Sequence, residues 1–108
     1  MQKAPATEML LSPIVLGELE LGVEKSAYPE RNRARLQTVI DGFTVITLNA
    51  ATSRAYGRIR GKLERRGLPI GNNDLWIAAQ ALALGVTLAT DNLREFERVP
   101  GLHIENWL

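Results

Sequence analysis

Between Asp74 and Asp91 the chain carries no charged side chain, and this apolar stretch constrains the fold more than any other part of the sequence. Residues 74–84 have the length and composition of a helix that is apolar nearly all round, and Gly85 is placed to end it. The next residues, VTLAT (86–90), are typical of a strand. A helix of this kind is stable only when other elements cover most of its surface. The stretch therefore predicts a helix and a strand at the centre of the fold.

The rest of the chain alternates between helical and extended patterns. Ser12 followed by Pro13 is a typical helix start, and Asn49 can cap another helix. The expected elements in chain order are a strand at 7–12, helices at 13–25 and from Pro29, a strand at 44–48, a helix at 50–66, the helix and strand described above, a helix or turn at 92–99, and an edge strand at 102–107. This alternation predicts a single α/β domain, residues 1–108, with a mostly parallel sheet and right-handed crossovers.

The composition excludes several classes of site. The 108 residues include no cysteine, so a disulfide framework, a thiolate zinc site and a cysteine nucleophile are ruled out, and the single His103 argues against a histidine-based triad. The net charge of +1 favours neither a membrane surface nor nucleic acid by itself. With no apolar run long enough to span a bilayer and no signal-like N-terminus, the chain is expected to be cytoplasmic, without a membrane partner.

The two acids that bracket the apolar stretch are expected to lie at one edge of the sheet. A helix of about 11 residues descends roughly 16 Å, and a strand of about 5 residues climbs back roughly the same distance. Asp74 and Asp91 should thus meet at the carboxyl end of the strands, where α/β folds keep their sites. Each acid also has a structural interpretation, because aspartate is favourable in a first helical turn and common in turns.

Glu18 is a third candidate. On a helical wheel it falls inside the apolar arc of the helix 13–25, beside Ile14 and Gly22. A carboxylate on an inner helix face costs free energy unless something pairs with it. Glu18 also lies little more than one turn from the start of its helix, so we expect it near the same sheet edge as the other two acids.

Three carboxylates in one cleft would require a cation. At about 5 Å and an effective dielectric constant near 20, each pair repels by roughly 3 kcal/mol. All-oxygen ligands select Mg²⁺ or Mn²⁺ over zinc, and such an ion orients a phosphodiester and lowers the pKa of a bound water. Glu95, in LREF, is close enough in sequence to join as an outer ligand or a base, although a surface glutamate would have the same pattern.

A row of basic side chains follows the predicted helix 50–66. Glu64 is the only acid among residues 53–66, against six basic residues. The row that shares one side of the helix consists of Arg54, Arg58, Lys62 and Arg65. Such a face fits the phosphate backbone of RNA, and it is equally typical of a solvated helix surface.

Three segments of the sequence resemble PIN-domain ribonucleases, especially the VapC toxins of bacterial toxin–antitoxin pairs: SPIVLGELELGVEKS, LPIGNNDLWIAAQALALGVTLATDN and REFERVPGLHIENW. The likeness runs from about residue 8 to the C-terminus. It implies a three-layer α/β/α fold and Mg²⁺- or Mn²⁺-dependent hydrolysis of single-stranded RNA, often a tRNA. It also implies a homodimer and inhibition by a cognate VapB-type antitoxin that fills the active groove.

The resemblance implies roles for individual residues. Glu18 matches the acid of the family's EL helix motif, and Asp74 matches the acid that opens the buried helix. Asn92 stands where the family has an acid or an asparagine two residues after a threonine, and Asp91 stands where the toxins often have an asparagine. Glu95 matches an acid that is frequent in these toxins. The implied metal ligands are thus Asp74, Glu18, Asp91 and Asn92, with Glu95 as a further catalytic residue.

One feature of the family has no counterpart in the sequence. The family opens with a strand carrying LDTN, whose aspartate is a principal metal ligand, whereas Met1 stands just before the position of the family's second strand. We therefore expect an N-terminally truncated PIN-like domain, which would be a fragment, the product of a mis-started reading frame, or a decayed toxin. The alternative to an active ribonuclease is a non-catalytic truncated toxin that binds an antitoxin or dimerises. A more distant alternative is a receiver-like signalling domain with Asp91 as phosphoacceptor, against which the motif order and the basic row both argue.

Overall fold

The structure is a computed structural model that describes residues 9–106, and the chain divides into two compact units. The N-terminal unit comprises Lys3–Thr47 and the C-terminal unit is built mainly from Leu48–Leu108. Residues 7 and 8 of the first predicted strand and residue 107 of the last one lie outside the described residues. None of the helices within residues 9–106 has the length and apolar character needed to cross a membrane.

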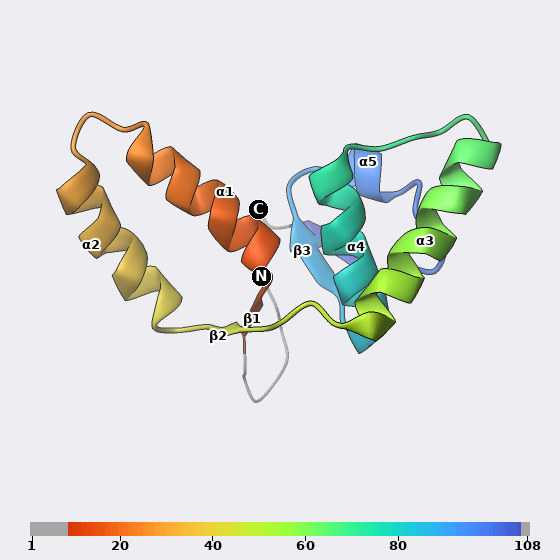
Figure 1. Ribbon diagram of the computed structural model, residues 1–108, viewed down its shortest axis with the longest axis horizontal. Coiled ribbons are helices and arrows are strands. Elements are labelled where there is room, and N and C mark those ends of the chain that lie inside the picture. The colour runs from red at the N-terminus through yellow and green to blue at the C-terminus, as the bar shows by residue number, and fades with distance from the viewer. Residues whose placement is uncertain (1–8, 107–108) are drawn as a thin grey trace. The chain divides into compact units, whose positions relative to one another are not determined.

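The N-terminal unit combines a helical hairpin with two short parallel strands (Figure 1). Its elements are β1 (Leu10–Leu11), α1 (Pro13–Glu24), α2 (Pro29–Ile40) and β2 (Thr44–Val45). The start of α1 confirms the prediction: the Ser12 hydroxyl accepts a hydrogen bond from the backbone N–H of Ile14 at 3.1 Å, and Pro13 occupies the first helical position. The strand predicted at 44–48 is shorter than expected and ends at Val45.

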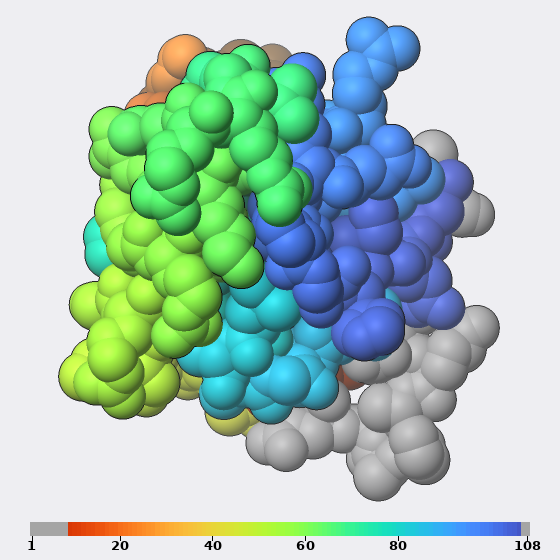
Figure 2. Space-filling view, turned by 90° about the vertical axis from the view of Figure 1, so that its right-hand side faces the viewer, coloured from red at the N-terminus to blue at the C-terminus, as the bar shows by residue number. Residues whose placement is uncertain are grey.

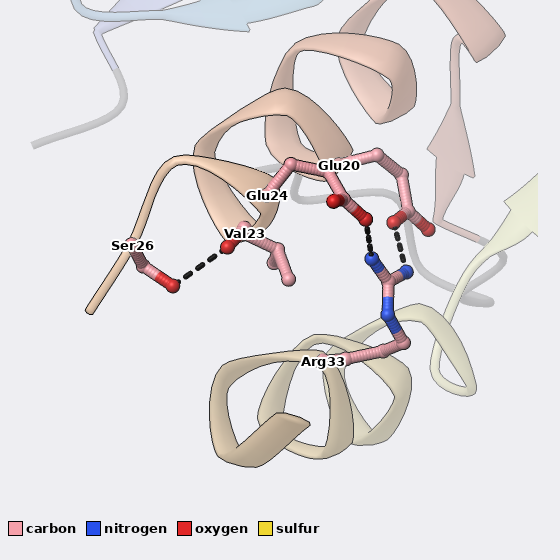
Figure 3. Close-up of polar contacts among 5 residues, drawn as sticks. All are labelled: Glu20, Val23, Glu24, Ser26 and Arg33. Carbon is pink, nitrogen blue, oxygen red and sulfur yellow. Dashed lines mark hydrogen bonds and ion pairs between the residues drawn. The ribbon is translucent and has the colours of Figure 1, made fainter. Parts of the chain in front are cut away.

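An arginine links the two helices of the hairpin. The guanidinium of Arg33 on α2 donates to the carboxylates of Glu20 and Glu24 on α1, one nitrogen to each (Figure 3). These contacts raise the pKa of Arg33 above its ordinary value, chiefly through the hydrogen bond to Glu20. Nearby, the hydroxyl of Ser26 donates to the carbonyl oxygen of Val23 at 2.6 Å. All three charged groups of the arginine cluster are solvent-exposed, so the cluster orients the helices more than it stabilises them.

The predicted broad inner face of α1 is wrong. Within this fully described helix burial is confined to Val23, while Leu21 is 56% exposed. Glu18 is exposed as well, not enclosed among apolar side chains. The reason is that a helical wheel assumes a partner wide enough to cover the whole arc. Here every residue of α2 is exposed or half-buried, so the hairpin offers α1 only a narrow apolar contact.

The C-terminal unit holds most of the core. Its elements are α3 (Ala50–Arg65), α4 (Asn72–Leu84), β3 (Leu88–Thr90), α5 (Leu93–Phe96) and β4 (Ile104–Asn106). Helices α3 and α4 pack side by side, and β3 pairs in parallel with β4 from Leu88 opposite Ile104 to Thr90 opposite Asn106 (Figure 1). The prediction that α4 is the most deeply packed helix is confirmed, since Ala78 and Ala79 are fully buried and Leu75, Ile77, Gln80 and Ala81 are buried as well.

Local hydrogen bonds explain where α3 begins and how it is tied to α4. The Asn49 side-chain oxygen accepts from the backbone N–H of Thr52 at 3.0 Å, which confirms the predicted cap. In the middle of α3, the ring of Tyr56 stacks on Trp76 of α4 with ring centroids 3.9 Å apart. The Tyr56 hydroxyl donates to the Asn72 side-chain oxygen at 2.7 Å and accepts from Arg60 at 2.7 Å. These contacts fasten the first turn of α4 to α3.

The predicted single sheet is not observed as one sheet. The strand pairs are both parallel, as predicted, but the described strands form two sheets of two strands each. One pair lies in each unit. The alternation of helices and strands therefore predicted the parallel direction of the strands but not how many strands pair in one sheet. Helix α4 also begins at Asn72, two residues before the predicted start, because Gly71 rather than a side-chain cap precedes it.

Gly85 and Gly57 form a matched pair for testing the end of α4. Gly85 ends the helix with φ 71°, in the left-handed region, and Gly57 lies within α3; a Cβ at either position would meet nothing within 4 Å. Gly85→Ala is therefore expected to lower the free energy of unfolding by about 1–2 kcal/mol, the backbone cost of that conformation. Gly57→Ala should raise it by roughly 0.5–1 kcal/mol through helix propensity. Urea unfolding of both variants measures the difference, and shifts of the same sign would contradict this account.

Candidate active site

The candidate site lies where the start of α4 meets the end of β3, within the C-terminal unit. Asp74 stands in the first turn of α4, and Asn92 follows β3 by two residues. The Asn92 side-chain amide donates to a carboxylate oxygen of Asp74 at 3.3 Å. Helix α4 runs away from this edge and β3 returns to it, so residues that are 18 positions apart in sequence come into contact.

Glu95 of α5 completes a group of three side chains. Its carboxyl group is hydrogen-bonded to that of Asp74, and one of its oxygens accepts from the backbone N–H of Gly71 at 3.2 Å. Gly71 is the N-cap residue of α4, so Glu95 binds one of the backbone donors that a helix start leaves without an intrahelical partner. The favourable end of the helix dipole therefore faces this carboxylate.

The pKa of Glu95 is lowered from its ordinary value of 4.5. The largest cause is the side-chain hydrogen bond with Asp74, followed by the hydrogen bond from the Gly71 backbone and the charge of Arg98, while desolvation acts in the opposite direction. Arg98 is itself held by a hydrogen bond to the carbonyl oxygen of Pro69 at 2.7 Å. A hydrogen bond between two carboxyl groups requires that one of them carries a proton, so without a cation the two groups are not both ionised.

The donor chemistry of this group fits a hard divalent cation. Asp74 and Glu95 supply carboxylate oxygens and Asn92 an amide oxygen, which are the ligands that Mg²⁺ and Mn²⁺ prefer. Among residues 9–106, no three His, Cys, Asp or Glu side chains gather closely enough to hold a metal ion. Two carboxylates are nevertheless a common protein share for Mg²⁺, which keeps several waters and binds substrate phosphates. A cation could also take the place of the proton that joins the acids.

Asp91 and Glu18 are the other two predicted acids. Asp91 is exposed in the bend after β3, next to Asn92 in sequence. Glu18 lies on α1 in the N-terminal unit. The structure thus brings together Asp74, Asn92 and Glu95 in direct contact.

Sequence reasoning missed the groups that support these side chains. The backbone N–H of Asn92 donates to the hydroxyl of Thr90 at 3.0 Å, which fixes the turn after β3. Gly71 holds Glu95 by a hydrogen bond, and the charge of Arg98 acts on it, as described above. A threonine two residues before an asparagine is a local turn signal that could have been read from the sequence. The roles of Gly71 and Arg98 depend on tertiary contacts across 24 and 29 residues and leave no such signal.

The predicted basic row is exposed along α3. All four of its side chains, Arg54, Arg58, Lys62 and Arg65, lie on the outer surface of this helix. Arg65 folds back along α3, with a guanidinium nitrogen 3.2 Å from the position that a Cβ on Gly61 would take. The other three line a groove that is described below.

Known proteins resemble this chain over most of its length. A model of the PIN domain family matches residues 2–102. The chain is 45% identical to Ribonuclease VapC2 of Rickettsia felis over 97 residues, which are 90% of this chain and 72% of that protein. It is 43% identical to the tRNA(fMet)-specific endonuclease VapC of Salmonella typhimurium over 101 residues, 94% of this chain and 76% of that protein.

Solved structures show the same likeness. The chain superimposes on a chain of VapBC2 from Rickettsia felis, solved bound to a DNA fragment from the VapBC2 promoter, with a TM-score of 0.90 and 44% identity. The match covers 94% of this chain and 76% of the solved one. For DNA-bound VapBC from Salmonella typhimurium the TM-score is 0.89 with 43% identity, over 93% and 76% of the two chains. The α/β arrangement with parallel strands is therefore shared with these proteins.

Proposed function

The chain belongs to the PIN-domain family, as a VapC-type ribonuclease, and on this premise we propose that it hydrolyses phosphodiester bonds of single-stranded RNA or tRNA with Mg²⁺ or Mn²⁺. The observation that carries the proposal is the contact between the carboxyl groups of Asp74 and Glu95 at the start of α4, with Asn92 beside them. Two acids in hydrogen-bond contact are stable without a cation only when they share a proton, so their arrangement suits a divalent ion.

In this proposal Asp74, Glu95 and Asn92 hold the metal ion, and Asp91 and Glu18 are further ligands by family resemblance. When bound, the ion neutralises the acids, orients a phosphodiester and lowers the pKa of a water molecule. The residues of the chain keep the acids in position. The Gly71 backbone holds Glu95, the charge of Arg98 favours the ionised form of Glu95, and the Asn92 amide orients Asp74.

We propose the substrate and partners from the relatives. The relative in Salmonella typhimurium is a tRNA(fMet)-specific endonuclease, which makes this tRNA the first substrate to test. The solved VapBC structures support a VapB-type antitoxin as partner, and the family resemblance supports a homodimer. A tRNA substrate is consistent with action in the cytoplasm.

Incubation of the 108-residue protein with tRNA(fMet) tests the activity. With Mg²⁺ or Mn²⁺ we expect cleavage into two defined fragments, and with EDTA we expect no cleavage until the metal is restored, because the acids act through the ion. Gel separation of end-labelled tRNA measures both outcomes. Cleavage that continues undiminished in EDTA would contradict the role given to the metal.

A non-catalytic module that binds an antitoxin is the second candidate. It is favoured by the finding that the described residues, 9–106, bring only two carboxylates together in the candidate site. This candidate predicts a stable complex with a VapB-type antitoxin and no tRNA cleavage at any concentration of Mg²⁺ or Mn²⁺. Size-exclusion chromatography of the mixed proteins, run beside the cleavage assay, separates the two candidates.

A further inference from the structure

A groove of about 410 Å³ lies between α3, the end of α4 and the segment after α5. These three segments meet in Figure 2, with α3 in green, the end of α4 in cyan and the segment after α5 in blue. Three cations from α3 line the groove, and its remaining lining residues are Ala51, Ala55, Ile59, Leu82, Ala83 and Pro100. We call it the cation groove, and its cations are Arg54, Arg58 and Lys62.

The charges of the cation groove are available to a ligand. Within residues 9–106 the recorded ion pairs use Arg33 and Arg60, and the three groove cations take part in none of them. All three side chains are exposed. Three positive charges on one helix face produce a potential that attracts a polyanion.

The spacing of these cations suits a nucleic acid strand. They stand four residues apart, so each step along α3 is about 6 Å. This distance is comparable with the separation of successive phosphates in an extended single strand. The lining is basic or aliphatic rather than aromatic, so it would hold the backbone by charge and would not read bases by stacking. Half of its apolar lining residues are alanines, so it offers a partner helix little large apolar surface.

The cation groove is distant from the candidate active site along α4. Ala83, in the groove lining, lies nine residues beyond Asp74, which corresponds to about 13 Å of helix. A phosphate held in the groove is therefore not the phosphate at the acids. Contacts that bind the substrate equally before and during the reaction affect KM and leave kcat unchanged, and this is what we expect of the cation groove.

We propose that Arg54, Arg58 and Lys62 bind three consecutive phosphates of the RNA substrate at a distance from the bond that is cleaved. This inference rests on the proposed ribonuclease function and narrows the basic row from four residues to three. Arg65 is excluded because it lies over Gly61 and not in the groove.

Salt dependence of RNA binding tests the proposal without requiring cleavage. The probe is fluorescein-labelled tRNA(fMet) in EDTA, with fluorescence anisotropy measured from 50 to 200 mM salt. Each phosphate contact on a single strand contributes about 0.7 to the slope of log affinity against log salt, so replacing all three cations by Gln should reduce the slope by about 2. The affinity of the native protein should accordingly fall about 20-fold more over this range than that of the variant.

A matched control removes the same charge elsewhere. Lys25, Arg31 and Arg35 are exposed cations of the N-terminal unit, and replacing them by Gln should leave the slope near its native value. The double variant Arg54→Lys, Arg58→Lys keeps all three positive charges, so its slope of log affinity against log salt should equal that of the native protein. Equal losses in both triple variants, or loss of binding to a VapB-type antitoxin with the RNA slope intact, would overturn the proposal.

The kinetic outcome separates this proposal from the proposed function. If the ribonuclease assignment holds, the groove variant should raise KM for tRNA(fMet) by tenfold or more at 50 mM salt, with kcat unchanged. If the groove variant had the same KM as the native protein, the proposed phosphate contacts would be contradicted and the ribonuclease function would not. Absence of cleavage in the native protein, with the salt slope as expected, would overturn the ribonuclease and not the phosphate contacts.

Discussion

Asp74→Asn is expected to reduce tRNA cleavage by about 10²- to 10³-fold, because a metal ion supplies several kcal/mol of transition-state stabilisation and each 1.36 kcal/mol is worth tenfold in rate. The substitution keeps the shape of the side chain and removes one of the two carboxyl groups at the start of α4. Initial rates of tRNA(fMet) cleavage in saturating Mg²⁺ measure the effect. Calorimetry should also show Mn²⁺ affinity lowered by more than about tenfold, since loss of even an outer-shell partner costs this much.

The control for this substitution is Glu97→Gln. Glu97 is an exposed acid at the end of α5, two residues from Glu95, and its loss should leave both cleavage and Mn²⁺ binding unchanged. Glu18→Gln asks a separate question, because Glu18 enters the proposal through family resemblance. A comparable loss in Glu18→Gln would add this residue to the site. Native cleavage in Asp74→Asn would remove Asp74 from it.

Leu63→Ala is expected to lower the free energy of unfolding by about 2–5 kcal/mol. Leu63 is only 1% exposed and lies on α3, which packs against α4, so truncation leaves a cavity in the best-packed part of the protein. Domains of this size are stable by about 5–15 kcal/mol in total, which makes the loss a large fraction. At roughly 4–8 °C per kcal/mol, the melting temperature should fall by about 10 °C or more. Thermal unfolding followed by circular dichroism measures it.

Leu84→Ala provides the comparison for a leucine outside the core. Leu84 ends α4 and is 45% exposed, so its truncation should cost less than about 1 kcal/mol. If both variants lost a similar amount of unfolding free energy, burial between α3 and α4 would not be the cause of the large loss expected for Leu63→Ala.

Helix boundaries were predictable where one residue decides them. Ser12 with Pro13, Asn49 and Gly85 each act through local backbone chemistry, and each stands where the structure begins or ends a helix. Strand lengths were less predictable, because pairing depends on the neighbouring strand. The sequence patterns at 44–48 and 86–90 exceed β2 and β3, which keep two and three residues.

The candidate site was predictable to the extent that element lengths determine it. Equal rises of a helix and a strand place Asp74 near the turn that holds Asn92, and the two side chains are in contact. The exposure of Glu18 was not predictable in this way, because a helical wheel does not show which neighbouring elements cover the helix. The hydrogen bond from the Gly71 backbone to Glu95 could not be predicted either, since any residue offers a backbone donor and the sequence does not mark which one is used.

The hydrogen bond from Tyr56 to Asn72 has a consequence for substrate length. It joins the helix that carries the three cations to the turn that carries Asp74, and the two places where we expect RNA to be bound both lie in the C-terminal unit. The distance between these two places therefore sets a minimum length for an RNA that binds at both. An oligonucleotide too short to reach from one place to the other binds at only one of them. A folded RNA binds at both only when its strand extends over this distance.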